Sequence, residues 1–467
     1  MMSLIITLFK WLLGAFLGFI AMVLVILYIR GAFRWRSLFH IKQALPPDDP
    51  RFAAALKSLS ASIEATGSVV DFWDTPDKIQ SARLAAINRA TQSIQFETFM
   101  MTPGRRADDF ADAIAKKCAE GVKVQLLVDS WGARSLNKKY WQRLGSVGAE
   151  VVFFNPFDWR APANYAGRTH RKLLIIDSQL ALIGGAGVSN LWDGTEKADD
   201  TSVWFDIEFS LVGDVVGVFS TLFQAHWQGH KTDNKVTHID MALMYPAKTN
   251  LAKTNLAKTE PAKTDPAKQE NAFSSTMPMA GTPSTVLVTP GTKPNYRDSP
   301  IETIKQTLIA SAQKRIWLSS PYFLPNMSTR KLLIEAKKSG LDVRILTTSD
   351  RSDKKPVYYA SYEVYGPLLE AGVQIFEYRP SMLHAKMLMI DDRWTNTGSA
   401  NLDYRSFLHN DELDIVTNNK QLFNKIEQTF EKGFSQSEQI TLRQWQRRSW
   451  LKHRILGNAV RLVQWQL

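Results

Sequence analysis

The segment His170-Arg-Lys-Leu-Leu-Ile-Ile-Asp177 recurs later in the chain as His384-Ala-Lys-Met-Leu-Met-Ile-Asp391. Both have the form His-x-Lys-x4-Asp, and 214 residues (384 − 170) separate the two histidines. A turn of small residues follows each copy at the same offset, Gly184-Gly185 in the first and Gly398-Ser-Ala-Asn401 in the second. Two copies of one polar pattern indicate a single site that is assembled from two related halves.

Each copy continues as a short apolar run, 173–176 and 387–390, which is typical of a buried strand. Residues two apart on a strand share a face, so the histidine and the lysine of each copy are expected to point the same way. A buried ammonium is unfavourable unless an anion compensates it. One copy alone is best interpreted as a strand with an exposed polar end. Two copies favour a cationic pocket for a phosphate.

The spacing is similar to the HKD motifs of the phospholipase D superfamily, and the resemblance covers about residues 68–235 and 284–435. It implies an α/β fold of two homologous phospholipase D-like halves, with mixed sheets flanked by helices and one active site between them. The alternation of expected elements agrees with this class. Strands are expected at 93–101, 122–129, 150–154, 315–320, 341–347 and 373–378, and helices at 107–120 and 329–338.

Three further segments resemble the bacterial cardiolipin synthase branch: Gln95-Phe-Glu-Thr-Phe99, Ser320-Pro-Tyr-Phe-Leu-Pro325 and Gly398-Ser-Ala-Asn-Leu-Asp-Tyr-Arg-Ser-Phe407. The resemblance implies an enzyme that moves a phosphatidyl group from phosphatidylglycerol to the hydroxyl of a second lipid. One segment departs from the branch, which often has Gly-Gly-x-Asn after its first motif. Here the segment is Gly184-Gly-Ala-Gly187, which leaves the phosphate contacts of the first half open.

The resemblance also implies a two-step reaction through a phosphohistidine, with His170 as nucleophile and His384 as general acid and base. The near symmetry of the motifs leaves that order open. The lysines would hold the nonbridging oxygens, whereas the aspartates, at strand ends, are expected to fasten backbone. No metal or other cofactor is required. The expected catalytic set is His170, Lys172, Asp177, His384, Lys386 and Asp391.

Two acids downstream of the motifs, Asp206 and Glu412, fit the family pattern. Each is expected to orient the histidine of the opposite half, the alternative being an ordinary surface carboxylate. Ser399 and Asn401 are expected to donate hydrogen bonds to the phosphate. Three histidines resemble a metal cluster by spacing, without a cysteine or paired acids to support one: His226, His230 and His238.

The N-terminus contains an uncharged apolar run of 19 residues, 11–29, long enough to span a bilayer as a helix. We expect a retained anchor at about residues 5–30. A signal peptide is the alternative, but the run is long for one and no clear cleavage site follows. Basic residues follow the run, at Arg30, Arg34, Arg36 and Lys42. The positive-inside rule then predicts a single-pass protein of the bacterial inner membrane with a cytoplasmic body.

Beyond the anchor we expect a first half at 68–240, a low-complexity linker at 241–283, a second half at 284–435 and a basic aromatic segment at 436–467. The linker carries five-residue repeats such as Pro246-Ala-Lys-Thr-Asn250, a period that fits neither helix nor strand. Residues 441–467 contain no acid and several arginines among Trp445, Trp450 and Trp465. This segment either lies on an anionic membrane or docks on the body.

Composition narrows the function. The net charge of +12 favours an acidic partner, and the single cysteine excludes an intrachain disulfide or a cysteine-based metal cluster. A membrane-bound phosphatidyltransferase acting on phospholipids is the leading hypothesis. The alternatives are a phospholipase D hydrolase that releases phosphatidic acid, a nuclease-type phosphodiesterase and a non-catalytic membrane scaffold. The anchor argues against a nucleic-acid partner.

Overall fold

The computed structural model describes residues 2–32, 44–159, 167–193, 203–233, 281–291, 299–462 and 464. The predicted linker at 241–283 therefore lies outside the described residues up to position 280, as do His238 and Trp465.

In the described residues, fifteen strands form one continuous mixed sheet, and its two halves repeat one order of seven strands, to which the second half adds β17. Three neighbouring strands run parallel in each half, and the other neighbours are antiparallel. The second half has the order β17 (Ser437–Ile440), β12 (Gln374–Tyr378), β11 (Asp342–Thr348), β10 (Arg315–Ser320), β13 (Met387–Ile390), β14 (Trp394–Gly398), β16 (Leu413–Thr417) and β9 (Ser284–Pro290). The first half continues with β1 (Ile63–Trp73), β8 (Glu208–Val212), β7 (Leu180–Gly184), β6 (Leu173–Ile176), β2 (Ser93–Thr98), β3 (Lys123–Asp129) and β4 (Glu150–Phe154).

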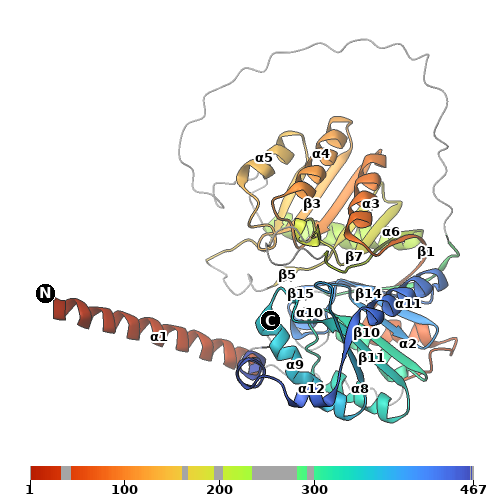
Figure 1. Ribbon diagram of the computed structural model, residues 1–467. Helices are drawn as coiled ribbons and strands as arrows, with labels where there is room; N and C mark the ends of the chain where they lie inside the picture. Colours follow the sequence, from red (N-terminus) through yellow and green to blue (C-terminus); the bar gives the residue numbers. More distant parts are fainter. Residues whose placement is uncertain are drawn as a thin grey trace, which may run out of the picture.

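Helices cover the sheet in matching positions in the two lobes (Figure 1). The first lobe carries α3 (Pro76–Arg89), α4 (Arg105–Ala119) and α5 (Lys138–Ser146), and the second carries α2 (Phe52–Ser60), α7 (Pro300–Ser311), α8 (Met327–Lys338) and α9 (Lys355–Glu370). Two further helices, α6 (Asp214–Asp233) and α11 (Lys420–Ser435), bury Phe219 and Phe430 in one apolar core that both halves share. That shared core makes the two halves one packed body.

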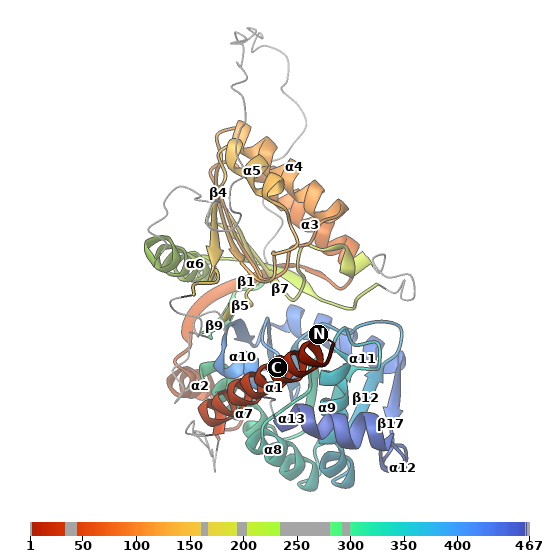
Figure 2. The same ribbon diagram turned by 90° about the vertical axis from the view of Figure 1, so that its left-hand side faces the viewer.

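One long strand joins the halves. Residues Ile63–Gly67 of β1 pair with β9, and from Ser68 onward β1 pairs with β8. Figure 2 shows β1 curving between the two lobes. The strand therefore crosses residue 68, where the sequence analysis started the first half.

The predicted core strands and helices are confirmed with end shifts of up to three residues. One expectation about the motifs is wrong, because His170, Lys172, His384 and Lys386 precede the strands β6 and β13 instead of lying in them. The reason is that the segment before each motif lies outside the main sheet. Before His170 the chain makes a separate two-stranded pair, β5 (Arg168–Thr169) with β15 (Asn410–Asp411), and before His384 Leu383 forms an isolated bridge with Phe205.

The N-terminal helix α1 (Met2–Ala32) projects from the body (Figure 1). Its segment Ile6–Ile26 has a mean hydropathy of 2.3, and none of it is buried. The predicted apolar helix is therefore confirmed, and it is long enough to cross a membrane.

The C-terminal segment comprises α12 (Leu442–Gln446), a π-helical stretch η3 (Trp450–Gly457) and α13 (Asn458–Leu462). It docks on α9, because Arg448 pairs with Glu363 and the Trp445 indole donates to the Tyr362 carbonyl at 2.8 Å. Its outer face leaves Trp450 and Leu451 66% and 64% exposed. The docked arrangement is thus correct for one face of the segment, and the other face is open.

Candidate active site

Each motif begins against backbone of the opposite half. The His170 amide donates to the Asp411 carbonyl at 2.8 Å, where β5 runs parallel to β15 between the lobes (Figure 1). The His384 amide donates to the Phe205 carbonyl at 2.7 Å, where Phe205 and Leu383 form a parallel bridge. The two motifs are therefore held at one junction between the halves.

The two acids follow directly from this register. Glu412 is the residue after Asp411, and its Oε2 lies 2.9 Å from His170 Nδ1. Asp206 is the residue after Phe205, and its Oδ2 lies 2.8 Å from His384 Nδ1. Both carboxylates are fully buried, so they are not ordinary surface acids. Because each Nδ1 faces an acid, Nε2 is the ring nitrogen left to react in both histidines.

Both lysines are buried and bind the carbonyl of their own histidine. Lys172 Nζ donates to His170 O, and Lys386 Nζ donates to His384 O, each at 2.6 Å. Lys386 Nζ also lies 3.0 Å from His384 Nε2. Charge on Lys386 lowers the pKa of His170, and charge on Lys172 lowers that of His384, so each ammonium acts on both rings.

The lysines and histidines of the two motifs repel one another when they carry positive charge. Burial, followed by repulsion from Lys386, lowers the pKa of Lys172 to about 7, and burial lowers the pKa of Lys386 to about 8. Burial and Lys386 lower the pKa of His384 to about 4, and burial and both lysines hold that of His170 well below its usual value. A bound anion would relieve this repulsion and raise all four pKa values.

These shifts predict how anion affinity depends on pH. A tetrahedral dianion such as tungstate requires charged lysines, and in the empty site these lose their protons above about pH 7 and pH 8. We therefore expect the tungstate dissociation constant to rise at least about tenfold between pH 6.5 and pH 8.5. Isothermal titration calorimetry measures it, and Lys172→Met should bind more weakly and with a shallower pH dependence. A constant affinity over this range in the wild type would contradict the pocket described here.

The motif aspartates do not contact the histidines in the structure. The Asp177 carboxylate accepts backbone N–H groups at the start of β2, and Asp391 accepts them at the start of β10. Both have left-handed backbone, with φ of 52° and 51°. This agrees with the expectation that they fasten backbone, and it gives them no direct part in the chemistry. The amide donors are Thr91, Gln92 and Ser93 for Asp177, and Gln313, Lys314 and Arg315 for Asp391.

The turns after the motifs differ between the halves. Ser399 Oγ donates to Glu412 Oε2 at 2.5 Å and so holds the acid. At the matching Gly185, a Cβ would lie 2.1 Å from the Asp206 carboxylate, and the Trp192 indole holds that acid instead at 3.1 Å. Asn401 is buried, and its Oδ1 accepts no hydrogen bond. The phosphate contacts expected of Ser399 and Asn401 stay predictions.

The departure at Gly187 has a steric reason. A Cβ at this position would lie 2.8 Å from the Met100 carbonyl oxygen and 3.1 Å from the Trp192 ring. An asparagine would fit only if this backbone and the indole moved. The glycine at position 187 therefore leaves room for the Trp192 indole that donates to Asp206.

A buried ion pair behind each turn was missed by the sequence analysis. Arg83 of α3 pairs with Glu208 of β8 and donates to the Ala186 and Gly187 carbonyls. In the second half, Lys305 of α7 pairs with Asp414 of β16 at 2.7 Å. The signal available in the sequence was an isolated charge in each apolar element, which does not reveal its partner.

Loss of one member of such a pair is expected to destabilise the fold. Arg83→Met leaves Glu208 and two carbonyls unpaired, and should lower the free energy of unfolding by about 3–5 kcal/mol. The Lys78–Asp74 pair at the N-terminal end of α3 is solvent-exposed, so Lys78→Met should change it by less than about 1 kcal/mol. Chemical denaturation of the detergent-solubilised chain, followed by tryptophan fluorescence, compares the two. Equal midpoints would contradict the assigned role of Arg83.

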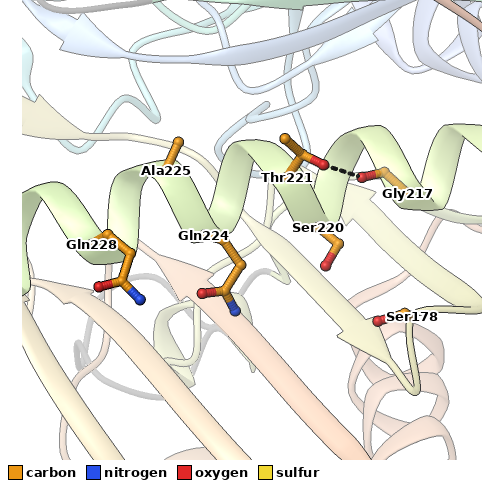
Figure 3. Close-up of a pocket in the computed structure, with 7 residues that line it drawn as sticks. All are labelled: Ser178, Gly217, Ser220, Thr221, Gln224, Ala225 and Gln228. Carbon is orange, nitrogen blue, oxygen red and sulfur yellow. Dashed lines mark hydrogen bonds between the residues drawn. The ribbon is translucent and has the colours of Figure 1, made fainter.

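A depression of about 520 Å³ lies along α6, lined by Gly217, Ser220, Thr221, Gln224, Ala225, Gln228 and Ser178 (Figure 3). None of these residues is titratable, and none belongs to the site built by His170 and His384. We therefore assign the chemistry to the buried junction and not to this depression.

The comparisons with known proteins agree with the geometry. A family model described as "Cardiolipin synthase, PLD-like domain" matches residues 84–227 and 306–433. The chain belongs to this family. It is a phospholipase D-superfamily enzyme, and the family implies phospholipid substrates.

Relatives of this cardiolipin synthase family member are similar over most of its length. Cardiolipin synthase 1 of Bacillus anthracis is 30% identical over 393 residues, which are 83% of this chain and 70% of the relative. The cardiolipin synthase of Halalkalibacterium halodurans is 28% identical over 381 residues, 81% and 68% of the two chains. The crystal structure of phosphatidylserine synthase from Haemophilus influenzae Rd KW20 superposes with a TM-score of 0.62 at 13% identity. It covers 89% of this chain and 99% of that one, a likeness of fold.

Proposed function

We propose that this enzyme is a membrane-bound phosphatidyltransferase that makes cardiolipin from phosphatidylglycerol and a second lipid acceptor through a phosphohistidine. The observation that carries the proposal is the crosswise arrangement of the site. Two buried imidazoles, each backed by an acid of the other half, lie at one junction with two buried lysine side chains. Such an arrangement suits a single phosphodiester.

In the first step, Nε2 of His170 attacks phosphorus and forms an N–P bond. The P–O bond to the glycerol headgroup breaks, and Nε2–H of His384 protonates the leaving oxygen. Lys172 and Lys386 stabilise the charge on the nonbridging oxygens. The products of this step are glycerol and a phosphatidyl-histidine.

In the second step, Nε2 of His384 takes the proton from the acceptor hydroxyl. That oxygen attacks phosphorus, the N–P bond breaks, and His170 is regenerated. With phosphatidylglycerol as acceptor the product is cardiolipin. Water as acceptor would give phosphatidic acid by the same residues.

The acids support His384 as the proton donor. Burial alone would raise the pKa of Asp206, but the charge and hydrogen bond of His384 outweigh burial and lower it. Burial raises the pKa of Glu412. An acid that stays ionised stabilises an imidazolium better, so once phosphate binds His384 is the ring favoured to hold a proton. His170, beside the carboxyl group whose pKa is raised, is the better neutral nucleophile.

Product analysis tests the proposal. The purified full-length chain is incubated with phosphatidylglycerol labelled in the headgroup and in the acyl chains, and separately with an oligonucleotide. We expect cardiolipin and free glycerol in equal amounts. Phosphatidic acid as the main product would establish the hydrolase, and oligonucleotide cleavage without lipid turnover would establish the nuclease.

The setting proposed for this reaction is the bacterial inner membrane, with α1 as a single span and the body on the cytoplasmic side. The C-terminal segment supports contact with an anionic surface. It exposes Trp450, Leu451 and Leu462 next to Lys452 and Arg454. Exposed apolar side chains among basic ones are typical of a surface that rests on anionic lipid.

Fluorescent labels test this contact in the full-length chain. In a Cys118→Ser background, an environment-sensitive dye is attached at Leu451→Cys, or at Lys331→Cys on α8 as an exposed control. In vesicles with anionic lipid, emission from position 451 should shift to shorter wavelength, whereas emission from position 331 stays unchanged. Equal behaviour at the two positions would contradict the membrane contact.

A further inference from the structure

A second buried cluster of charge lies behind His170. His226 of α6 stands between two carboxylates: its Nδ1 lies 2.8 Å from Glu97 Oε1, and its Nε2 lies 3.5 Å from Asp411 Oδ2. Glu97 belongs to β2 of the first half and Asp411 to β15 of the second, so this imidazole links the halves. Both carboxylates are 2% exposed or less. The mechanism proposed above uses none of the three side chains.

The two carboxylates flank His170 along the chain and in space. Thr169, the residue before His170, donates its hydroxyl to Glu97 Oε1 at 2.5 Å. Asp411 accepts the His170 amide at 2.8 Å through its carbonyl, and the next residue, Glu412, faces the His170 ring. Any movement of Glu97 or Asp411 is thus transmitted to the backbone of His170 or to its supporting acid.

The charges of the cluster compensate one another. Burial and the nearby Arg171 would lower the pKa of His226, but Glu97 and Asp411 outweigh them and raise it. Burial would raise the pKa of Glu97, but His226 and Arg171 lower it to about 2. The ring of His230 lies 5.3 Å from that of His226 and adds no carboxylate. A protonated His226 between the side chains of Glu97 and Asp411 is the favoured state.

Among the described residues, the second half has no such cluster. In the strand pairing, Ser319 on β10 takes the place of Glu97 on β2, because Ser319 pairs with Met387 as Glu97 pairs with Leu173. Phe205 takes the place of Asp411, because it accepts the His384 amide. Alanine stands at position 385 where the first motif has Arg171. The charged set therefore surrounds His170 alone, and His384 has apolar or neutral residues in the matching places.

We propose that His226, as an imidazolium, clamps Glu97 to Asp411 and thereby positions His170 for attack on phosphorus. His226 is a positioning residue, since it acts through Thr169, Asp411 and Glu412 and not on the substrate. The proposal rests on the proposed role of His170 as nucleophile. It explains why one of two similar motifs carries an extra buried cation with two acids.

The rate of the first chemical step, formation of the N–P bond, is the quantity that tests the role of His226. A short-chain phosphatidyl ester of p-nitrophenol has a leaving group that needs no acid, so the burst of p-nitrophenolate reports formation of the N–P bond. We expect His226→Phe to slow this burst about 10–100-fold, as a displaced nucleophile does, with KM within threefold of the wild type. His230→Phe, which changes the next histidine along α6 and leaves Glu97 and Asp411 paired, should keep the wild-type burst rate.

A double variant separates positioning from stability. His226→Phe removes the imidazolium between Glu97 and Asp411, which leaves Arg171 as the cation near Glu97, and should lower the melting temperature. Adding Glu97→Gln removes one of these charges, so stability should recover in part while the burst stays slow. A folded His226→Phe enzyme with the wild-type burst rate would overturn the clamp, as would a burst that recovers in step with stability. Absence of any burst in the wild type would instead overturn the phosphohistidine route.

Discussion

Replacement of His170 by alanine is expected to remove both the p-nitrophenolate burst and lipid turnover, by about four orders of magnitude or more. His170 has its Nδ1 against Glu412, which leaves Nε2 to react, and no other group in the proposed scheme forms the N–P bond. His384→Ala should behave differently. It loses turnover of phosphatidylglycerol, because glycerol needs a proton to leave, yet it should still release about one equivalent of p-nitrophenolate from the activated ester.

This pair of variants assigns the roles that the symmetric motifs leave open. Stopped-flow absorbance gives the burst, and circular dichroism shows that each variant is folded. A burst in His170→Ala and none in His384→Ala would reverse the assignment. Near-normal turnover of phosphatidylglycerol in either variant would contradict a shared site.

Asp206→Asn is expected to lower the rate with phosphatidylglycerol by about 10²–10⁴-fold. The amide can hold the ring of His384, but it supplies no negative charge to stabilise the imidazolium, whose pKa is already low, at about 4, in the empty pocket. The p-nitrophenyl ester should be affected less than about tenfold in its burst, because that leaving group needs no proton.

The matched change in the other half sharpens this prediction. Glu412→Gln removes the acid that faces His170. Burial raises the pKa of this acid, Glu412. This substitution should slow the burst more than Asp206→Asn does, and turnover of phosphatidylglycerol less. The burst rate with the p-nitrophenyl ester and the steady-state rate with phosphatidylglycerol, measured for both variants, give the comparison. Equal effects on both substrates would contradict separate roles for the acids.

Much of this site could be predicted from local patterns in the sequence. The His-x-Lys-x4-Asp spacing and the apolar runs of β6 and β13 follow from sequence, because polar residues just ahead of a buried strand need a reason. The same holds for Asp177 and Asp391, which end these strands. The crosswise acids were also expected, but only through the family resemblance.

The remaining features depend on register between distant segments. Glu412 meets His170 because β15 runs parallel to β5, and both strands are only two residues long. No sequence pattern predicts pairing between strands this short. The spacing of His226 from His230 and His238 resembled a metal cluster only superficially, and its partners Glu97 and Asp411 come from two other elements. The pairs Arg83–Glu208 and Lys305–Asp414 were hidden for the same reason.

The central claim is that both imidazoles act on one phosphorus atom. A structure of the full-length enzyme with tungstate, a tetrahedral dianion, tests it most directly. We predict one tungstate per chain at the junction of the halves, with Nε2 of His170 and Nε2 of His384 both within hydrogen-bond distance of its oxygens and Lys172 and Lys386 beside it. Tungstate bound to one histidine alone, or at two separate positions, would contradict the account.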